Sequence, residues 1–213
     1  MKLQNDFKVL YNNTVSITGS ISSEFRFSHE IFGETFYIVD ISVERNSGVF
    51  DVVPVMVSER LIDVTNNNIG QKVKVFGQFR SYNHHGDDRN RLILNVFAKE
   101  IEFIDSDDDC DDSNKLFLDG FVCKPPVYRK TPLGREIADL LIAVNRPYGK
   151  SDYIPCICWG RNARYVGGLK VGERIEVHGR IQSRVYTKRL PDGSSEERTA
   201  YEVSVGTLEV VEK

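Results

Sequence analysis

Two stretches, GQKVKVFGQF at 70–79 and GERIEVHGRI at 172–181, share their glycines and an alternation of apolar with polar residues. Alternation is typical of a β-strand with one buried face, because successive side chains point to opposite faces. The similarity continues outward from these stretches: residues 15–57 lie over residues 116–158 with eight identities in 43 positions. The identities include the pairs Gly19/Gly120, Arg45/Arg146 and Asp51/Asp152. The chain is therefore predicted to contain two copies of one fold.

An acidic segment separates the two copies. DSDDDCDDSN, residues 105–114, has six aspartates, and a run of like charge is typical of a solvated linker because it repels itself. We predict a first domain at 1–104, a linker at 105–113 and a second domain at 114–213. Residues 1–112 carry 11 Lys+Arg and 19 Asp+Glu, a net charge of -8, whereas residues 113–213 carry 17 and 12, a net charge of +5. Such a change of sign indicates a nucleic-acid-binding segment joined to an acidic one.

The second copy contains five short apolar or alternating segments separated by glycine, proline and aspartate turns. They are LFLDGFV, EIADLLIAVNR, DYIPCICW, RIEVHGRIQSRVYTK and RTAYEVSVG. One short helix is predicted at GRNARYVGG, between the third and fourth strands. This order is that of the oligonucleotide-binding (OB) fold. We expect an all-β protein of two tandem OB-fold five-stranded barrels, each with a short helix between strands 3 and 4.

The segment DYIPCICW separates into two faces. Ile154, Cys156 and Cys158 fall on one face and are assigned to the core, because free cysteine packs as a small hydrophobic residue. Tyr153, Pro155, Ile157 and Trp159 fall on the other. A metal site at the two cysteines would need about two further ligands, and C-x-C without a second pair is a weak zinc signal. We expect no metal and no cofactor.

The next long strand places His178, Arg180, Gln182, Arg184, Tyr186 and Lys188 on one face, opposite an apolar face. Bases stack on aromatic rings, and Lys or Arg pair with phosphates, so this combination favours single-stranded nucleic acid. A solvated basic face without a ligand is the alternative interpretation.

The second copy as a whole resembles the bacterial single-stranded DNA-binding protein family. The blocks that carry the resemblance are NKLFLDGFV from Asn114, GREIADLLIAVNR, YIPCICWGRNA, GLKVGERIEVHGRIQSR and RTAYEVSVGTLEVV, which ends at Val211. The resemblance implies an OB fold that binds single-stranded DNA with little sequence preference, and an assembly of four OB folds. Its stacking aromatics fall on Tyr148, Tyr153, Trp159 and Tyr186. In the first copy, Ser47, Val52 and Ser58 replace three of these rings, which predicts a degenerate binding face.

Together, these patterns predict one set of nucleic-acid-binding residues in the second domain. The set is Arg129, Arg146, Tyr148, Lys150, Tyr153, Trp159, Arg161, Arg180, Arg184, Tyr186 and Lys188.

The leading functional hypothesis is a non-enzymatic single-stranded DNA-binding protein of replication, recombination or repair. The expected partners are single-stranded DNA, a second copy of the chain in a dimer of four OB folds, and replication or repair proteins. The family's acidic C-terminal tail, which recruits such proteins, has no counterpart before Lys213, so we do not expect that device. The alternatives are a protein-interaction OB module of a replication-restart or primosome complex and an RNA-binding OB protein.

Two absences narrow the class of protein. The sequence contains no Walker-type loop, G-x-S-x-G or H-E-x-x-H motif, so we do not expect an enzyme. It also contains neither an apolar N-terminal leader nor a run of 18 apolar residues. The expectation is a cytoplasmic protein without a membrane association.

Overall fold

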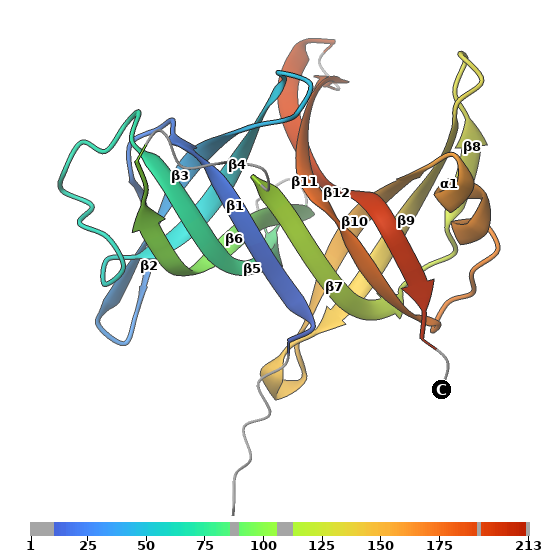
Figure 1. Ribbon diagram of the computed structural model, residues 1–213, viewed down its shortest axis with the longest axis horizontal. Coiled ribbons are helices and arrows are strands. Elements are labelled where there is room, and N and C mark those ends of the chain that lie inside the picture. Colours follow the sequence, from blue (N-terminus) through green and yellow to red (C-terminus); the bar gives the residue numbers. More distant parts are fainter. Residues whose placement is uncertain (1–10, 86–89, 106–112, 191–192, 212–213) are drawn as a thin grey trace, which may run out of the picture.

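The computed structural model describes residues 11–85, 90–105, 113–190 and 193–211, and these form two β-barrels side by side (Figure 1). The first barrel contains β1 (Asn13–Ile21), β2 (Arg26–Ile31), β3 (Glu34–Glu44), β4 (Phe50–Ser58), β5 (Lys72–His85) and β6 (Asn90–Phe103). The second contains β7 (Asn114–Val122), β8 (Val127–Lys130), β9 (Glu136–Asn145), the 3-10 helix η1 (Pro147–Gly149), β10 (Ser151–Trp159), α1 (Arg161–Val166), β11 (Arg174–Arg189) and β12 (Ser195–Val210). No helix of the described residues is long and apolar enough to cross a membrane.

Each barrel closes through the same circuit of five strands. In the first, β1 pairs with β3 and β5, β5 pairs with β6, β6 pairs in parallel with β4, and β4 pairs with β3. In the second, β7, β9, β10, β12 and β11 repeat this circuit. The predicted all-β fold of two five-stranded barrels is confirmed. The short strands β2 and β8 add an outer edge to it, on β3 and β9 respectively.

A glycine shared by the two copies allows the first strand of each barrel to serve two partners. Gly19 lies where β1 passes from β5 to β3, and a Cβ there would overlap the carbonyl oxygen of Ser42. Gly120 has the same place on β7, against the carbonyl oxygen of Ala143. The repeated glycines therefore reflect a close approach of backbones that no side chain permits.

The two barrels are joined along their first strands. β1 and β7 pair antiparallel, with Asn13 opposite Leu118 and Ile17 opposite Asn114, and Figure 1 shows them adjacent at the centre of the molecule. This pairing connects all twelve strands into one continuous order with β2 at one end and β8 at the other. The buried apolar residues of both barrels form a single core cluster.

The connection between the third and fourth barrel strands differs between the copies. After β10, α1 packs Ala163 and Val166 into the core. The repeat predicts a matching helix in the first barrel, but residues 59–71 form turns instead. The Asp63 carboxylate accepts hydrogen bonds from the Thr65 backbone N–H and the Asn66 side chain. Such side-chain bonds compete with helical hydrogen bonds and favour turns, so the expectation of a helix in each barrel is corrected to one helix, in the second.

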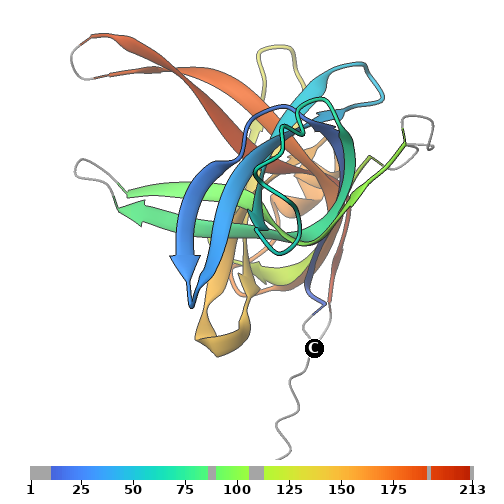
Figure 2. The same cartoon turned by 90° about the vertical axis from the view of Figure 1, so that its left-hand side faces the viewer.

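Two long hairpins extend from the barrels. Figure 2 shows the β5–β6 hairpin and the β11–β12 hairpin projecting toward the same side of the molecule. Both contain one irregularity of register, between Phe76 and Gly77 in the first and between His178 and Gly179 in the second. The fold therefore places both long hairpins on one side of the molecule.

Candidate nucleic-acid interface

Strand β10 has the two faces that its alternation predicts. Ile154, Cys156 and Cys158 are buried at 0–3% exposure, whereas Tyr153 and Trp159 are each 42% exposed. Large rings are usually drawn into the core, because burying one removes 150–250 Å² of surface from water. Here the rings of Tyr153 and Trp159 remain partly in solvent, because both side chains lie on the outer face of the same strand. Ile157, expected on the outer face with them, is instead buried.

The cysteines of this strand are packing residues. Burial raises the pKa of the Cys158 thiol to about 12 and also raises that of Cys156 well above its usual range. The thiolate, which is the reactive and metal-binding form, is therefore disfavoured at both positions. Among the described residues, no group of three His, Cys, Asp or Glu side chains is placed to hold a metal ion.

The β11–β12 hairpin carries a second group of the predicted residues. Ile175, Val177 and Ile181 are buried in the barrel, whereas beyond Ser183 the strand leaves the core and its side chains become exposed. The guanidinium of Arg184 lies 5.8 Å from the centre of the Tyr186 ring, which is 37% exposed. A cation over a ring holds both groups in place, so the hairpin presents a positive charge and an aromatic surface together.

The remaining predicted residues have different surroundings. Tyr148 is 87% exposed in η1, with a left-handed φ of 63°. Lys150, which lies between η1 and β10, and Arg161, the first residue of α1, are exposed. Arg129 on β8 is held by Asp139, at 2.9 Å, so its positive charge is offset.

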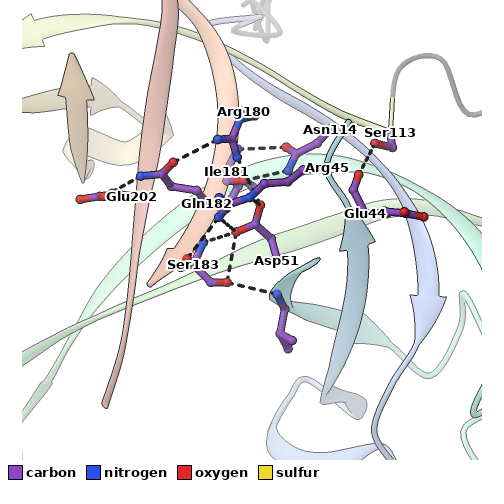
Figure 3. Close-up of polar contacts among 11 residues, drawn as sticks. Glu44, Arg45, Asp51, Ser113, Asn114, Arg180, Ile181, Gln182, Ser183 and Glu202 are labelled. Atoms are coloured by element: carbon purple, nitrogen blue, oxygen red, sulfur yellow. Dashed lines mark hydrogen bonds and ion pairs between the residues drawn. The ribbon is translucent and has the colours of Figure 1, made fainter. Parts of the chain in front are cut away.

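Two further predicted cations, Arg146 and Arg180, lie at the interface between the barrels, here called the seam, where β4 meets β11 and β5 meets β10. The Asp51 carboxylate of β4 is fully buried and accepts hydrogen bonds from Arg45, from Arg180 and from the backbone N–H of Ser183 on β11 (Figure 3). Burial opposes ionisation of Asp51, but the bonds from Arg45 and Ser183 and the charges of Arg45 and Arg180 outweigh it and lower its pKa. The carboxylate is therefore charged and ties the second barrel to the first.

A matching cluster lies at the equivalent position of the second barrel. The buried Asp152 carboxylate accepts a 2.7 Å hydrogen bond from the Ser81 backbone N–H on β5, and the Ser81 hydroxyl accepts one from the Tyr153 N–H. Arg146 lies 3.5 Å from Asp152. Burial raises the pKa of Asp152, and the Ser81 hydrogen bonds and the charges of Arg146 and Arg80 do not offset it. This second cluster is looser than the first, in the sense that its contacts stabilise the Asp152 carboxylate less than those of the first cluster stabilise Asp51.

Sequence reasoning missed the role of these residues, although the signal was present. The pairs Arg45/Arg146 and Asp51/Asp152 are among the identities between the two copies. A shared acidic and basic pair within strands that have otherwise diverged indicates a structural requirement common to both barrels. Here that requirement is the attachment of one barrel to the other, which also positions Tyr153.

The second barrel has known relatives. The model of the single-strand binding protein family matches residues 113–211, which span β7 to β12.

The second barrel is similar to the single-strand binding protein family.

Relatives in the single-strand binding protein family include the single-stranded DNA-binding protein of Halalkalibacterium halodurans, 38% identical over 80 residues, covering 34% of this chain and 48% of that protein. Single-stranded DNA-binding protein A of Bacillus subtilis is also 38% identical over 80 residues, covering 34% of this chain and 46% of that protein. The chain thus spans about half the length of the curated relatives it matches.

Solved structures extend the likeness to both barrels. The wild-type single-stranded DNA binding protein from Thermus aquaticus superposes with a TM-score of 0.73 at 19% identity, covering 94% of this chain and 93% of that one. A deletion mutant of the same protein gives a TM-score of 0.69 at 20% identity, covering 94% and 95%. At this identity the likeness shows the fold, and it extends over both barrels.

Proposed function

We propose that this chain is a non-enzymatic single-stranded DNA-binding protein, with the second barrel as its principal binding domain. The observation that carries the proposal is the exposure of Tyr153 and Trp159 on the outer face of β10. The match of the second barrel to the single-strand binding protein family supports it. The processes that such a protein would serve are replication, recombination or repair.

The proposed mechanism combines stacking with charge. Bases would stack on Tyr148, Tyr153, Trp159 and Tyr186, at about 1–3 kcal/mol per base. The backbone phosphates would pair with the more open cations, Lys150, Arg161, Arg184 and Lys188. Because every base has a π face and every nucleotide a phosphate, this mode of binding is indifferent to sequence.

The three predicted cations that pair with aspartates are expected to contribute less to phosphate binding. Arg129, Arg146 and Arg180 each form an ion pair with a carboxylate. A phosphate at these positions would have to compete with the carboxylate for the guanidinium. We therefore assign Arg146 and Arg180 first to the attachment of the barrels and only second to DNA.

Titration of the intact chain with dT oligomers of increasing length, at several salt concentrations, tests the proposal. We expect Trp159 fluorescence to be quenched, and the logarithm of the affinity to fall linearly with that of the salt concentration, with a slope of about -0.7 per phosphate contact. Oligomers of U at the same salt concentration distinguish RNA from DNA. Affinity that neither quenches Trp159 nor responds to salt would refute the mechanism.

We also propose that two chains associate, so that four barrels act together. The outer strands β2 and β8 lie at the two ends of the strand order, and unpaired strand edges favour association. Sedimentation velocity over a range of protein concentrations, with and without dT oligomers, tests this. A single monomeric species under all these conditions would contradict it.

A further inference from the structure

A row of aromatic groups crosses the outer surface of the first barrel. The rings of His29 on β2 and Phe36 on β3 are stacked, with centroids 5.0 Å apart and planes inclined by 11°. Phe36 in turn contacts Phe97 on β6 at 5.9 Å, and the guanidinium of Arg80 on β5 lies 5.3 Å from the Phe97 ring centre. The four groups come from four strands, so the row runs across the strands and not along one of them.

The row lies outside the core. Met56 of β4 lies between Ile38 of β3 and Phe97 of β6, and it alternates with the core residues Val55 and Val57. Met56 therefore points outward, yet it is only 8% exposed, so neighbouring side chains of this face cover it. The rings of His29, Phe36 and Phe97 are themselves partly exposed, so they form the solvent boundary of this face.

The second barrel has different chemistry at the same positions. By the offsets of the repeat, Phe36 corresponds to Ile137 and Phe97 to Ser204. Where His29 lies opposite Phe36, the second barrel has Arg129 opposite Ile137. Conversely, the position of Trp159 on β10 is taken by Ser58 on β4, which lies directly opposite Phe36 on the neighbouring strand. The first barrel has thus lost the ring on its third barrel strand and gained rings on the strands to either side.

We propose that the row of His29, Phe36 and Phe97 is a second base-stacking site for single-stranded DNA, on a face that residue-by-residue comparison of the copies would classify as degenerate. This inference rests on the proposed function and assigns it further residues. The location supports it: OB folds bind oligonucleotides across the face of strands 2 and 3 and between the loops after strands 1 and 4. In the first barrel these are β3 and β4, the segment that contains β2, and the β5–β6 hairpin.

The row would bind bases with little contribution from phosphates. Its one cation, Arg80, already covers Phe97 and lies close enough to Asp152 to interact with its charge. The ring of His29 opposite Phe36 stands where the second barrel has the cation Arg129 opposite Ile137, so a cation is replaced here by a ring. Stacking depends weakly on salt, so binding to this row should persist at salt concentrations that weaken the second barrel.

The test compares Phe36→Leu and Phe97→Leu with the matched control Phe103→Leu, which alters an exposed ring on β6 outside the row. Leucine keeps an apolar side chain but removes the stacking face. Each intact variant is titrated at high salt with a short dT oligomer, which one barrel can accommodate, and a long one, which can span both. We expect each row variant to lose roughly tenfold in affinity for the long oligomer, with little change for the short oligomer and none for the control.

A second measurement uses the unaltered chain and so does not depend on the folding of variants. Ultraviolet cross-linking to a long dT oligomer, followed by mass spectrometry, should identify peptides that contain Phe36 or Phe97 alongside the peptide of Trp159. Cross-links confined to the second barrel would overturn the inference.

The outcomes separate this inference from the function on which it rests. If oligomers quench Trp159 but the row variants bind the long oligomer as the unaltered chain does, the row is not a DNA site, while the proposed function stands. If the row variants lower only the free energy of unfolding, the rings serve to cover Met56 and do not bind DNA. An unchanged DNA affinity is also what a row that binds a protein partner would give. If no oligomer binds at all, the proposed function itself fails.

Discussion

The Asp51 carboxylate on β4 accepts a 2.6 Å hydrogen bond from the backbone N–H of Ser183 on β11, across the seam between the barrels. The same carboxylate is bound by Arg45 from its own barrel and by Arg180 from the other. Two guanidinium groups and a backbone donor therefore converge on one buried anion. This cluster determines how the β11–β12 hairpin is placed relative to the first barrel.

Asp51→Asn should lower the free energy of unfolding by about 1–3 kcal/mol, because it leaves two guanidinium groups without their shared anion while keeping an acceptor for Ser183. The loss is expected to be moderate because Arg45 and Arg180 are 26% and 35% exposed and can reach water. Urea unfolding at neutral pH measures it. Asp105→Asn, at an exposed position, is the control and should change nothing.

The two seam aspartates should respond to pH in opposite directions. The pKa of Asp51 is lowered in the folded chain, so its contribution to stability is present above its ordinary value of 3.8 and is lost as the pH falls below that value. The pKa of Asp152 is raised, so its contribution is present below 3.8 and is lost as the pH rises through the folded value.

Urea unfolding between pH 7 and pH 3 checks this difference. Asp51→Asn should reduce the loss of stability on acidification, whereas Asp152→Asn should be tolerated better at pH 7 than Asp51→Asn. Equal costs for the two substitutions at pH 7 would contradict the assignment of a looser cluster at Asp152.

Trp159→Ala should weaken binding of dT oligomers by about 1–3 kcal/mol, or roughly 5- to 150-fold, whereas Trp159→Phe should retain most of the affinity because it keeps a stacking ring. Tyr165→Ala removes an exposed ring of α1 outside the proposed surface and is the matched control. Fluorescence anisotropy of a labelled oligomer measures all three, since two of the variants lack the tryptophan signal. Equal losses for Trp159→Ala and Tyr165→Ala would argue against a specific stacking role.

Arg184→Ala and Arg180→Ala should differ in the salt dependence of binding. Arg184 is exposed and stacked on Tyr186, so its loss should reduce the slope of log affinity against log salt by about 0.7, the value for one phosphate contact with a single strand. Arg180 is paired with Asp51, so its loss should lower stability and change the slope less. A larger change in slope for Arg180→Ala than for Arg184→Ala would indicate that Arg180 contacts a phosphate.

Cys156 and Cys158 should resist alkylation in the native chain, because burial raises the pKa of both thiols. Cys123 is only partly buried and should react before these two. Iodoacetamide labelling at pH 8 followed by peptide mass spectrometry distinguishes the sites, with the unfolded chain as the positive control. Native labelling at Cys158 would show that β10 opens in solution.

Much of each barrel follows from local pattern. A strand turns successive side chains to opposite faces, so the alternation of this strand was enough to predict that Cys156 and Cys158 are buried and that Trp159 is not, although it wrongly placed Ile157 outside. The repeat indicated two copies of one fold because equal spacing of glycines and apolar residues reflects equal backbone requirements. Where short side chains bond to nearby backbone, as Asp63 does, the pattern failed, and the helix expected from the second copy became turns.

The sequence by itself therefore determined the class of fold, the duplication and the exposed rings of the second barrel, because these depend on periodicity along one strand. Only the tertiary structure decided which cations are already paired and where the first barrel's rings meet. Asp51 and Ser183 are 132 positions apart in the chain, and Phe36 meets Phe97 across the face of a closed barrel. Such contacts depend on how strands are ordered and how barrels join, which no local spacing encodes.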